Sequence, residues 1–410
     1  MFFIYKVLIN IVFFFSPIII IIRLIKRKEN IKRFIEKIGF FTKKRVSGKL
    51  FWFHGASVGE IQSIIPLIEK LEKDKTINQI LITSNTLSSS FIINKLSLKK
   101  TIHQFYPIDC NFISSKFLNY WKPSKAFFVD SEIWPNTVNN LYNRKIPIIL
   151  LNGRITKKTY NRWMKFPNLS RFLFSKFQLC LSSSYESKKY LKKLGANNVK
   201  YFGNLKFSQS ENQSIKIDKN LKNFLLKKNS WCASSTHYNE EKYCALTHLK
   251  LKKKYKDLLT IIIPRHVDRI DKIRNELENL NLNIHLDYPK KKIKSNTDIY
   301  LVNSYGKTKS IFKICKNVFL GGSLINHGGQ NPLEAAMYGC RVFHGPNISN
   351  FREIYGHLKK KNVSYKVVNQ NHLTNLLRKK LDKKNYSKKS IKNLTLEGTK
   401  ILNKIFNEIC

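Results

Sequence analysis

The sequence predicts an α/β protein with two domains, each built on a parallel sheet that is wound on both faces. Three observations lead to this fold class. Short apolar runs alternate with stretches of helical spacing, the alternation resumes after a polar segment in mid-chain, and 410 residues suffice for two domains of ~100–200 residues. We expect an anchor with a basic flank over residues 1–33, a first domain over 34–207, a linker over 208–225, and a second domain with its tail over 226–410.

The N-terminal segment is typical of a membrane anchor. Residues 2–22 are apolar except for Tyr5, Lys6, Asn10 and Ser16, and a bilayer span needs ~20 such residues. Basic residues follow the run at 23–33, which places the rest of the chain in the cytoplasm by the positive-inside rule. A signal peptide would carry its basic cluster first, and a buried helix of a soluble domain is the other alternative. We therefore predict a single anchor in the inner (plasma) membrane, with both domains on its cytoplasmic face.

Charge and cysteine content narrow the class of partner only a little. The chain has 75 Lys and Arg against 26 Asp and Glu, a net charge of +49 that would suit nucleic acid, anionic lipid or lipopolysaccharide. The lysines are scattered rather than gathered on one face, and the basic tail is typical of solvated helix and loop, so we expect no nucleic-acid partner. Seven widely spaced cysteines without a C-x-x-C pair indicate a reducing compartment.

Buried strands are expected wherever a short apolar run ends in a polar or glycine-bearing turn. In the first domain these runs are residues 50–53, 79–83, 125–129 and 147–151, with helical spacing at 61–71 and around 138–142. In the second domain they are residues 259–263, 298–302 and 318–320.

The glycine-rich stretch at residues 319–334 reads as a strand, a turn and a helix start. Gly pairs at 321–322 and 328–329 permit close backbone approach, and Asn331 can cap a helix whose first turn holds Pro332 and Glu334. Backbone N–H groups there would face an anionic ligand. Tight turns alone would also explain the glycines, but we favour a phosphate or nucleotide site, although no Walker A pattern is present.

Candidate catalytic residues of the first domain follow strands, where open parallel sheets bind ligands. Glu60 can act as a general base towards a hydroxyl, or only favour a helix N-terminus. Asp130 and Glu132 end the third predicted strand and can face the same place or cap the next helix. Lys206 can meet negative charge developing on a leaving phosphate, although lysines are too abundant to single one out.

In the second domain Arg265 follows strand 259–263 and can grip phosphate, or form a rim salt bridge with Asp268. The hydroxyl-rich residues 234–236 are expected at a helix start, where they can touch phosphate or merely cap.

A metal site is not expected. His237 and Glu241 are one helical turn apart, but no further ligand is near them in sequence, and His54, His103 and His266 are isolated. We also expect no cofactor.

The chain resembles the Kdo (3-deoxy-D-manno-octulosonic acid) transferases of lipopolysaccharide synthesis over nearly its whole length after the anchor. The motifs that carry the resemblance lie, in order, at residues 54–60, 130–136, 152–154, 203–206, 234–237, 264–266, 321–323, 328–334 and 345–347. The resemblance implies a GT-B glycosyltransferase, in which two Rossmann-like domains face each other across a cleft. It implies CMP-Kdo as donor, held by the C-terminal domain, and a lipid A precursor as acceptor, held by the N-terminal domain.

Roles for individual residues also follow from the resemblance. It implies that Glu60 is the general base, that Asp130 or Glu132 with Lys206 stabilises the transition state, and that transfer is inverting and metal-independent. The donor side would use Pro264, Arg265, Tyr305, Gly306, Lys307, Asn331, Pro332, Leu333 and Glu334. Lys206, Arg265 and the helix at Asn331 would support the departing CMP in place of a metal.

The chain departs from the family pattern at four motif positions: Gly55 replaces alanine, Asp130 and Lys307 replace glutamate, and Gln330 replaces histidine. Lys307 reverses the charge beside the expected nucleotide. Two alternatives stay open: another GT-B envelope enzyme with a different nucleotide sugar, and a membrane-tethered binding protein whose catalytic site has decayed.

Overall fold

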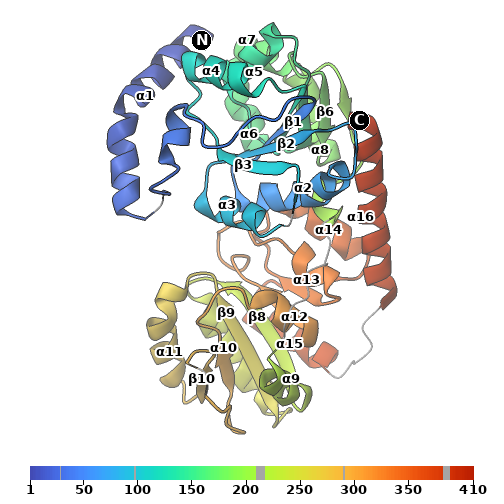
Figure 1. Ribbon diagram of the computed structural model, residues 1–410. Helices are drawn as coiled ribbons and strands as arrows, with labels where there is room; N and C mark the ends of the chain where they lie inside the picture. The colour runs from blue at the N-terminus through green and yellow to red at the C-terminus, as the bar shows by residue number, and fades with distance from the viewer. Residues whose placement is uncertain (28, 97, 209–217, 290, 382–387) are drawn as a thin grey trace. The chain divides into compact units, whose positions relative to one another are not determined.

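The computed structural model describes the whole chain except residues 28, 97, 209–217, 290 and 382–387 (Figure 1). The chain divides into two compact units. Unit 1 comprises Met1–Ser210 and Glu397–Cys410, and unit 2 comprises Glu211–Leu396. Each unit contains a seven-stranded sheet in which all the pairings are parallel.

The sheet of unit 1 has the strand order β3-β2-β1-β4-β5-β6-β7. Its strands are β1 (Leu50–His54), β2 (Gln79–Ser84), β3 (Thr101–Phe105), β4 (Lys125–Val129), β5 (Ile148–Gly153), β6 (Leu179–Ser182) and β7 (Val199–Lys200). The helices are α1 (Phe2–Ile25), η1 (Phe34–Ile38), α2 (Val58–Leu71), α3 (Leu87–Asn94), α4 (Asn111–Trp121), α5 (Pro135–Asn143), α6 (Lys157–Trp163), α7 (Pro167–Phe174), α8 (Tyr185–Lys193) and η2 (Leu205–Ser208). The strand order reverses between β1 and β4, which is where such sheets bind ligands.

The central strands of this sheet are apolar because both of their faces are covered. Every residue of β1 is buried, and the rings of Phe53 and Phe127 stack across β1 and β4 with centroids 4.3 Å apart. Trp52, on the other face of β1, packs edge-on against Phe128. This packing fixes where β1 and β4 end, and therefore where the candidate catalytic residues begin.

The sheet of unit 2 has the order β10-β11-β9-β8-β12-β13-β14, with its own reversal between β8 and β12. Its strands are β8 (Asn229–Thr236), β9 (Leu258–Pro264), β10 (Ile284–Leu286), β11 (Ile299–Leu301), β12 (Asn317–Leu320), β13 (Arg341–His344) and β14 (Ser364–Lys366). The helices are α9 (Lys219–Leu226), α10 (Glu240–Lys252), η3 (Val267–Arg269), α11 (Ile270–Glu278), α12 (Thr308–Ile314), α13 (Leu333–Met337), α14 (Arg352–Lys360) and α15 (Gln370–Leu381). The last helix of the chain is α16 (Lys388–Ile409).

The seven strands expected from apolar runs are confirmed to within two residues at either end, but β6, β7, β8, β10, β13 and β14 were not expected, and neither was β3. Its sequence carries His103 and Gln104, which are both buried. His103 is accommodated by Ser84 and Arg33, whose side chains lie 2.9 and 3.0 Å from its ring nitrogens. The strand that ends at Asp130 is therefore the fourth, not the third. Residues 234–236 end β8, so the helix start expected there was wrong.

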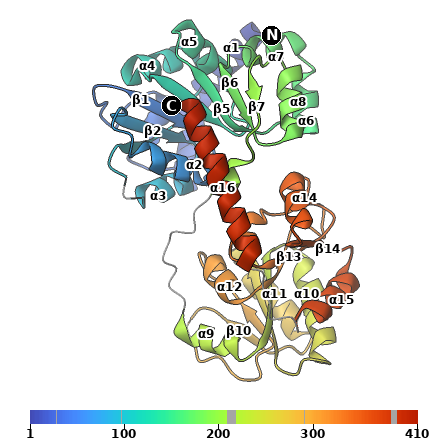
Figure 2. The same ribbon diagram turned by 90° about the vertical axis from the view of Figure 1, so that its right-hand side faces the viewer.

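Two domain boundaries differ from those expected. The tail assigned to the second domain returns to unit 1 from Glu397 onward (Figure 2). It packs there because Ile401, Ile405 and Ile409 form a buried stripe along α16. Glu408 also pairs with Lys200 at 2.6 Å. Of the expected linker, residues 209–217 lie outside the described residues, and much of the rest forms α9, which packs into the core of unit 2.

Helix α1 is the one helix of the described chain that is long and apolar enough to cross a membrane.

Candidate functional site

The four predicted catalytic residues come together at the carboxyl end of the unit 1 sheet. Glu60 stands in the first turn of α2, just beyond β1, and Asp130 and Glu132 follow the adjacent strand β4. Lys206, in η2, places its Nζ 3.3 Å from Oδ2 of Asp130. Three carboxylates and an ammonium group therefore lie at the point where the strand order of unit 1 reverses.

Glu60 lies in the N-terminal cap of α2 and has a raised pKa. It completes a capping box, because its carboxylate accepts the Ser57 N–H at 3.4 Å while Ser57 Oγ accepts the Glu60 N–H at 3.4 Å. The carboxylate also accepts the Ala56 N–H at 2.7 Å and the Ser57 hydroxyl at 3.0 Å. Burial, with the charges of Glu132 and Asp130, raises the pKa of Glu60 to about 7. A carboxylate with this pKa can accept a proton at neutral pH.

Glu132 is oriented by a tryptophan and a buried histidine. The Trp134 Nε1–H lies 3.1 Å from Glu132 Oε2 and 3.0 Å from His54 Nε2. Burial lowers the pKa of His54, so its ring is neutral, and Nδ1 lies 3.0 Å from the Thr83 hydroxyl. His54 was considered only as a metal ligand; its partners here, Thr83 and Trp134, lie 29 and 80 residues away, and no local pattern indicates them.

Replacing Glu132 with glutamine should lower the pKa of Glu60 from about 7 towards the ordinary 4.5, because the largest charge that opposes its ionisation is removed. The carboxyl ¹³C resonance of Glu60, followed through a pH titration, measures this. Glu69→Gln, on the same helix, is the control and should leave the midpoint unchanged. An equal midpoint in Glu132→Gln and wild type would contradict the assigned cause.

Asp130 and Lys206 are positioned by their backbones. Asp130 adopts a left-handed conformation with φ 63°, and its carbonyl accepts the Arg154 N–H at 3.0 Å. The side-chain oxygen of Asn152 accepts the Leu205 N–H at 2.9 Å, which holds η2 beside β5. Asn152 lay in a motif but had no expected role, because its partner is 53 residues away.

The predicted donor-side residues of unit 2 also share one end of a sheet. Pro264 ends β9 and Arg265 follows it, the turn at 305–307 follows β11, and residues 331–334 lead into and begin α13 after β12. Lys309 Nζ, in the first turn of α12, lies 3.6 Å from Glu334 Oε1, which links α12 to α13. Arg265 is exposed, and the structure as described contains no ion pair between it and Asp268.

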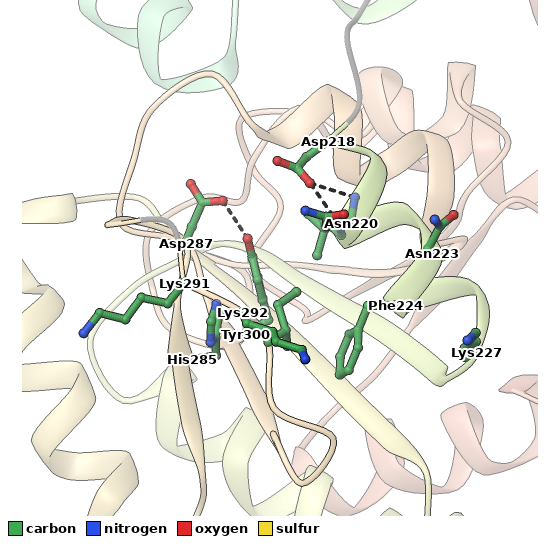
Figure 3. Close-up of a pocket in the computed structure, with 12 residues that line it drawn as sticks. Asp218, Asn220, Asn223, Phe224, Lys227, His285, Asp287, Lys291, Lys292 and Tyr300 are labelled. Atoms are coloured by element: carbon green, nitrogen blue, oxygen red, sulfur yellow. Dashed lines mark hydrogen bonds between the residues drawn. The ribbon is translucent and has the colours of Figure 1, made fainter.

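Lys307, the residue that reverses the family's charge, has an acidic partner. Its Nζ lies 3.7 Å from Oδ2 of Asp287, which also accepts the hydroxyls of Tyr300 and Ser304 at 2.7 Å each. Asp287 also lines a pocket of about 620 Å³ between α9, β10 and β11 (Figure 3). None of the predicted donor-side residues lines this pocket.

The glycine-rich turn after β12 does hold an anion, but the anion belongs to the protein. The N–H groups of Gly322, Ser323 and Leu324 donate to the carboxylate of Glu240 at 2.7 to 3.1 Å, as does the N–H of His237. Glu240 is fully buried. These three N–H groups are therefore not available to a phosphate, and a phosphate or nucleotide site at the helix start of residues 331–334 stays a prediction.

Close packing explains one of the glycines in this turn. A Cβ on Gly321 would lie 2.4 Å from the carbonyl oxygen of Ser235 and 2.8 Å from Glu240 Oε2. The helix that follows, α13, has only five residues. Its N-cap is Pro332, and the side-chain oxygen of the preceding Asn331 accepts the Leu333 N–H at 3.1 Å.

Three histidines lie together above the turn held by Glu240. The ring of His237 lies 4.1 Å from that of His327 and 5.8 Å from that of His266, centroid to centroid. Burial, followed by these rings, Arg265 and Arg269, lowers the pKa of His237 to about 4, so it is neutral at physiological pH. His266 therefore has other histidines beside it in the fold, whereas the sequence had indicated that it was isolated. Within the described residues, no group of three or more potential ligands is placed to hold a metal.

Comparison with known proteins gives matches along most of the chain. Residues 32–209 match the family model described as 3-deoxy-D-manno-octulosonic-acid transferase (kdotransferase). A 3-deoxy-D-manno-octulosonic acid transferase of Rickettsia bellii is 30% identical over 92% of this chain and 91% of its own length. That of Haemophilus influenzae is 28% identical over 79% and 77%.

Solved structures support the fold class. The UDP-GlcNAc 2-epimerase of Neisseria meningitidis superimposes with a TM-score of 0.59 at 15% identity, over 88% of this chain and 99% of that one. The fold alone follows from so distant a likeness. The predicted GT-B class, with two Rossmann-like domains, is confirmed.

Proposed function

The chain belongs to the 3-deoxy-D-manno-octulosonic acid (Kdo) transferase family, and from this membership we propose that this glycosyltransferase moves Kdo from CMP-Kdo to a lipid A precursor in lipopolysaccharide synthesis. The observation that carries the proposal is the cluster of Glu60, Asp130, Glu132 and Lys206 at the switch point of unit 1. Family membership points to Kdo as the sugar. The cluster contains the carboxylates and the ammonium group that transfer of this sugar would require.

In the proposed reaction Glu60 takes the proton from an acceptor hydroxyl. The oxygen attacks the anomeric carbon of Kdo, the bond from that carbon to the CMP phosphate oxygen breaks, and CMP leaves with the electron pair. Attack opposite the leaving group inverts the anomeric configuration. The pKa of about 7 supports Glu60 as the base, because at neutral pH it is partly ionised yet basic enough to hold the proton.

The remaining residues of the proposed site would stabilise the charges that develop during transfer. Lys206, oriented by Asp130 at 3.3 Å, would supply positive charge to the transition state, and Glu132 would keep Glu60 basic. In unit 2, exposed Arg265 offers a planar fork of donors to the CMP phosphate. Pro264, the 305–307 turn and residues 331–334 would complete the donor contacts. These cations would make a metal unnecessary.

Membrane association forms part of the proposal. The outward residues of α1 are apolar and exposed, and exposed Lys26, Arg27 and Lys32 follow it. A basic flank of this kind favours the anionic cytoplasmic leaflet of the inner membrane, where a lipid-linked acceptor would be available.

The test is transfer by the purified full-length chain. With a lipid A precursor as acceptor, we expect Kdo incorporation from CMP-Kdo that persists in EDTA, and no sugar transfer from UDP-GlcNAc. Transfer from the uridine donor instead would favour another GT-B envelope enzyme. Binding of CMP-Kdo without transfer would reject the acceptor, and absence of donor binding by a folded protein would indicate a decayed site.

A further inference from the structure

Helix α1 turns one continuous stripe towards unit 1 over its whole length. The residues that lose solvent exposure recur every three or four positions: Phe2, Tyr5, Lys6, Ile9, Phe13, Ser16, Ile20, Arg23 and Leu24. This spacing is that of one helix face. Figure 1 accordingly shows α1 running beside the rest of unit 1 rather than projecting away from it.

The N-terminal half of this stripe makes specific contacts. The Tyr5 hydroxyl donates at 2.8 Å to the buried carboxylate of Asp109, which also accepts the N–H groups of Asn136 and Thr137 at the start of α5. The rings of Phe2 and Phe172 lie 5.3 Å apart, and those of Phe13 and Phe112 lie 6.4 Å apart. The first half of α1 is thus bound to the surface made by α4, α5 and α7.

The C-terminal end of α1 is held by charge. Arg23 Nε lies 2.5 Å from Oε1 of Glu29, and Lys37 Nζ lies 2.6 Å from the same oxygen. The Glu29 side chain is 1% exposed. A buried carboxylate with two cationic partners is costly to separate from either of them. Both ends of the helix are therefore attached to unit 1.

The opposite face of α1 is apolar and has no protein partner among the described residues. Phe3 and Phe14 are 75% and 77% exposed, and the same face carries Ile4, Val7, Leu8, Ile11, Val12, Phe15, Ile18, Ile19, Ile21, Ile22 and Ile25. The polar residues of the helix lie on the inner stripe, apart from Asn10. Phe112 and Phe172 are themselves partly exposed beside α1 and extend the apolar surface.

We propose that α1 lies in the plane of the membrane, with its outer face in the cytoplasmic leaflet and its N-terminus on the same side as the folded units. The partner is an anionic lipid surface, which exposed Lys26, Arg27 and Lys32 complement in charge. This inference rests on the membrane association proposed above and gives it an orientation.

Length alone does not decide between lying and spanning. A helix of 24 residues is ~36 Å long at 1.5 Å per residue, enough to cross a hydrocarbon core of about 30 Å. A spanning helix, however, would have to leave Asp109 without Tyr5 and separate Phe13 from Phe112. It would also carry Lys6, near the N-terminus of the helix, to the far side of the membrane. An in-plane helix keeps every one of these contacts.

Disulfide cross-linking in native inner membranes tests the orientation. In full-length protein with Cys410→Ser, which removes the one exposed cysteine, the pair Phe13→Cys and Phe112→Cys should form a disulfide on mild oxidation. The matched control is Phe14→Cys with Phe112→Cys, because Phe14 points outward. We expect several-fold more disulfide in the Phe13 pair, measured by mass spectrometry. A separate Phe3→Cys variant should resist an impermeant maleimide applied to the periplasmic side of spheroplasts.

The outcomes separate this inference from the function on which it rests. Membrane-bound protein that lacks the Phe13 cross-link and is labelled at residue 3 from the periplasmic side would overturn the in-plane orientation and leave the anchor standing. Protein that cross-links but does not sediment with membranes would overturn both the orientation and the proposed membrane association, while the transfer assay would still judge the chemistry.

Discussion

Glu60→Gln should reduce Kdo transfer by about 10²–10⁴-fold, the range over which a positioned general base contributes. Glutamine keeps the size of the side chain and an oxygen that can accept the Ala56 N–H, but it cannot take the proton from the acceptor hydroxyl. The loss should appear in kcat with saturating CMP-Kdo and acceptor. CMP-Kdo binding by the variant, measured by calorimetry, should equal that of the wild type.

Two variants separate catalysis from helix capping. Glu69→Gln, on the same helix, should retain wild-type activity. Ser57→Ala removes the hydroxyl that accepts the Glu60 N–H and should cost roughly 1 kcal/mol of stability with only a small loss of activity. Glu60→Gln activity within a few-fold of that of Ser57→Ala would mean that Glu60 only caps α2.

The raised pKa of Glu60 also predicts how the activity of the wild type and the relative stability of Glu60→Gln change with pH. Wild-type activity should rise as pH increases through about 7, since Glu60 must be ionised to act as base. The folded-state pKa lies above the ordinary 4.5, so the wild type loses stability between pH 4.5 and 7 as the unfolded chain releases this proton first. Glu60→Gln lacks that loss. Its melting temperature relative to wild type should therefore increase over this window and level off above pH 7.

Glu240→Ala should lower the free energy of unfolding of unit 2 by about 3–5 kcal/mol. The carboxylate accepts four backbone N–H groups, and alanine would leave these donors buried without an acceptor, each at a cost of about 1–3 kcal/mol before water enters. Urea denaturation measures the loss. Hydrogen exchange of the 321–324 amides should accelerate, which assigns the loss to the glycine-rich turn.

Two control variants accompany this prediction. One changes the charge at Glu240 itself, and the other removes an exposed carboxylate elsewhere in unit 2. Glu240→Gln keeps an accepting oxygen and should cost less than alanine. Glu278→Ala, in the exposed ion pair with Arg274 on α11, should change stability by no more than ~0.5 kcal/mol. The role assigned to Glu240 would be refuted by a Glu240→Ala variant that unfolds like Glu278→Ala.

The sequence by itself determined the fold class and seven of the fourteen described strands. Strand β4 was expected with the bounds it has, residues 125–129, because a strand buried on both faces must be a continuous apolar run, and such a run is local. Glu60, Asp130 and Glu132 were expected at a site for a related reason. Parallel strands present their carboxyl ends at one edge, so residues just after β1 and β4 must converge.

Only the tertiary structure decided which polar groups are satisfied, and by what. Buried His103 and Gln104 hid β3 from an apolar pattern, and Glu240 proved to occupy the anion position of a turn 82 residues further along the chain. In α1, hydrophobicity predicted a membrane helix. The hydrogen bond of Tyr5 to Asp109 and the ion pair of Arg23 with Glu29 show which face of this helix packs against the protein. Apolar burial leaves a periodic local signal. A hydrogen bond or an ion pair needs only one partner, and that partner can lie at any distance along the chain. Only the folded structure therefore reveals these interactions.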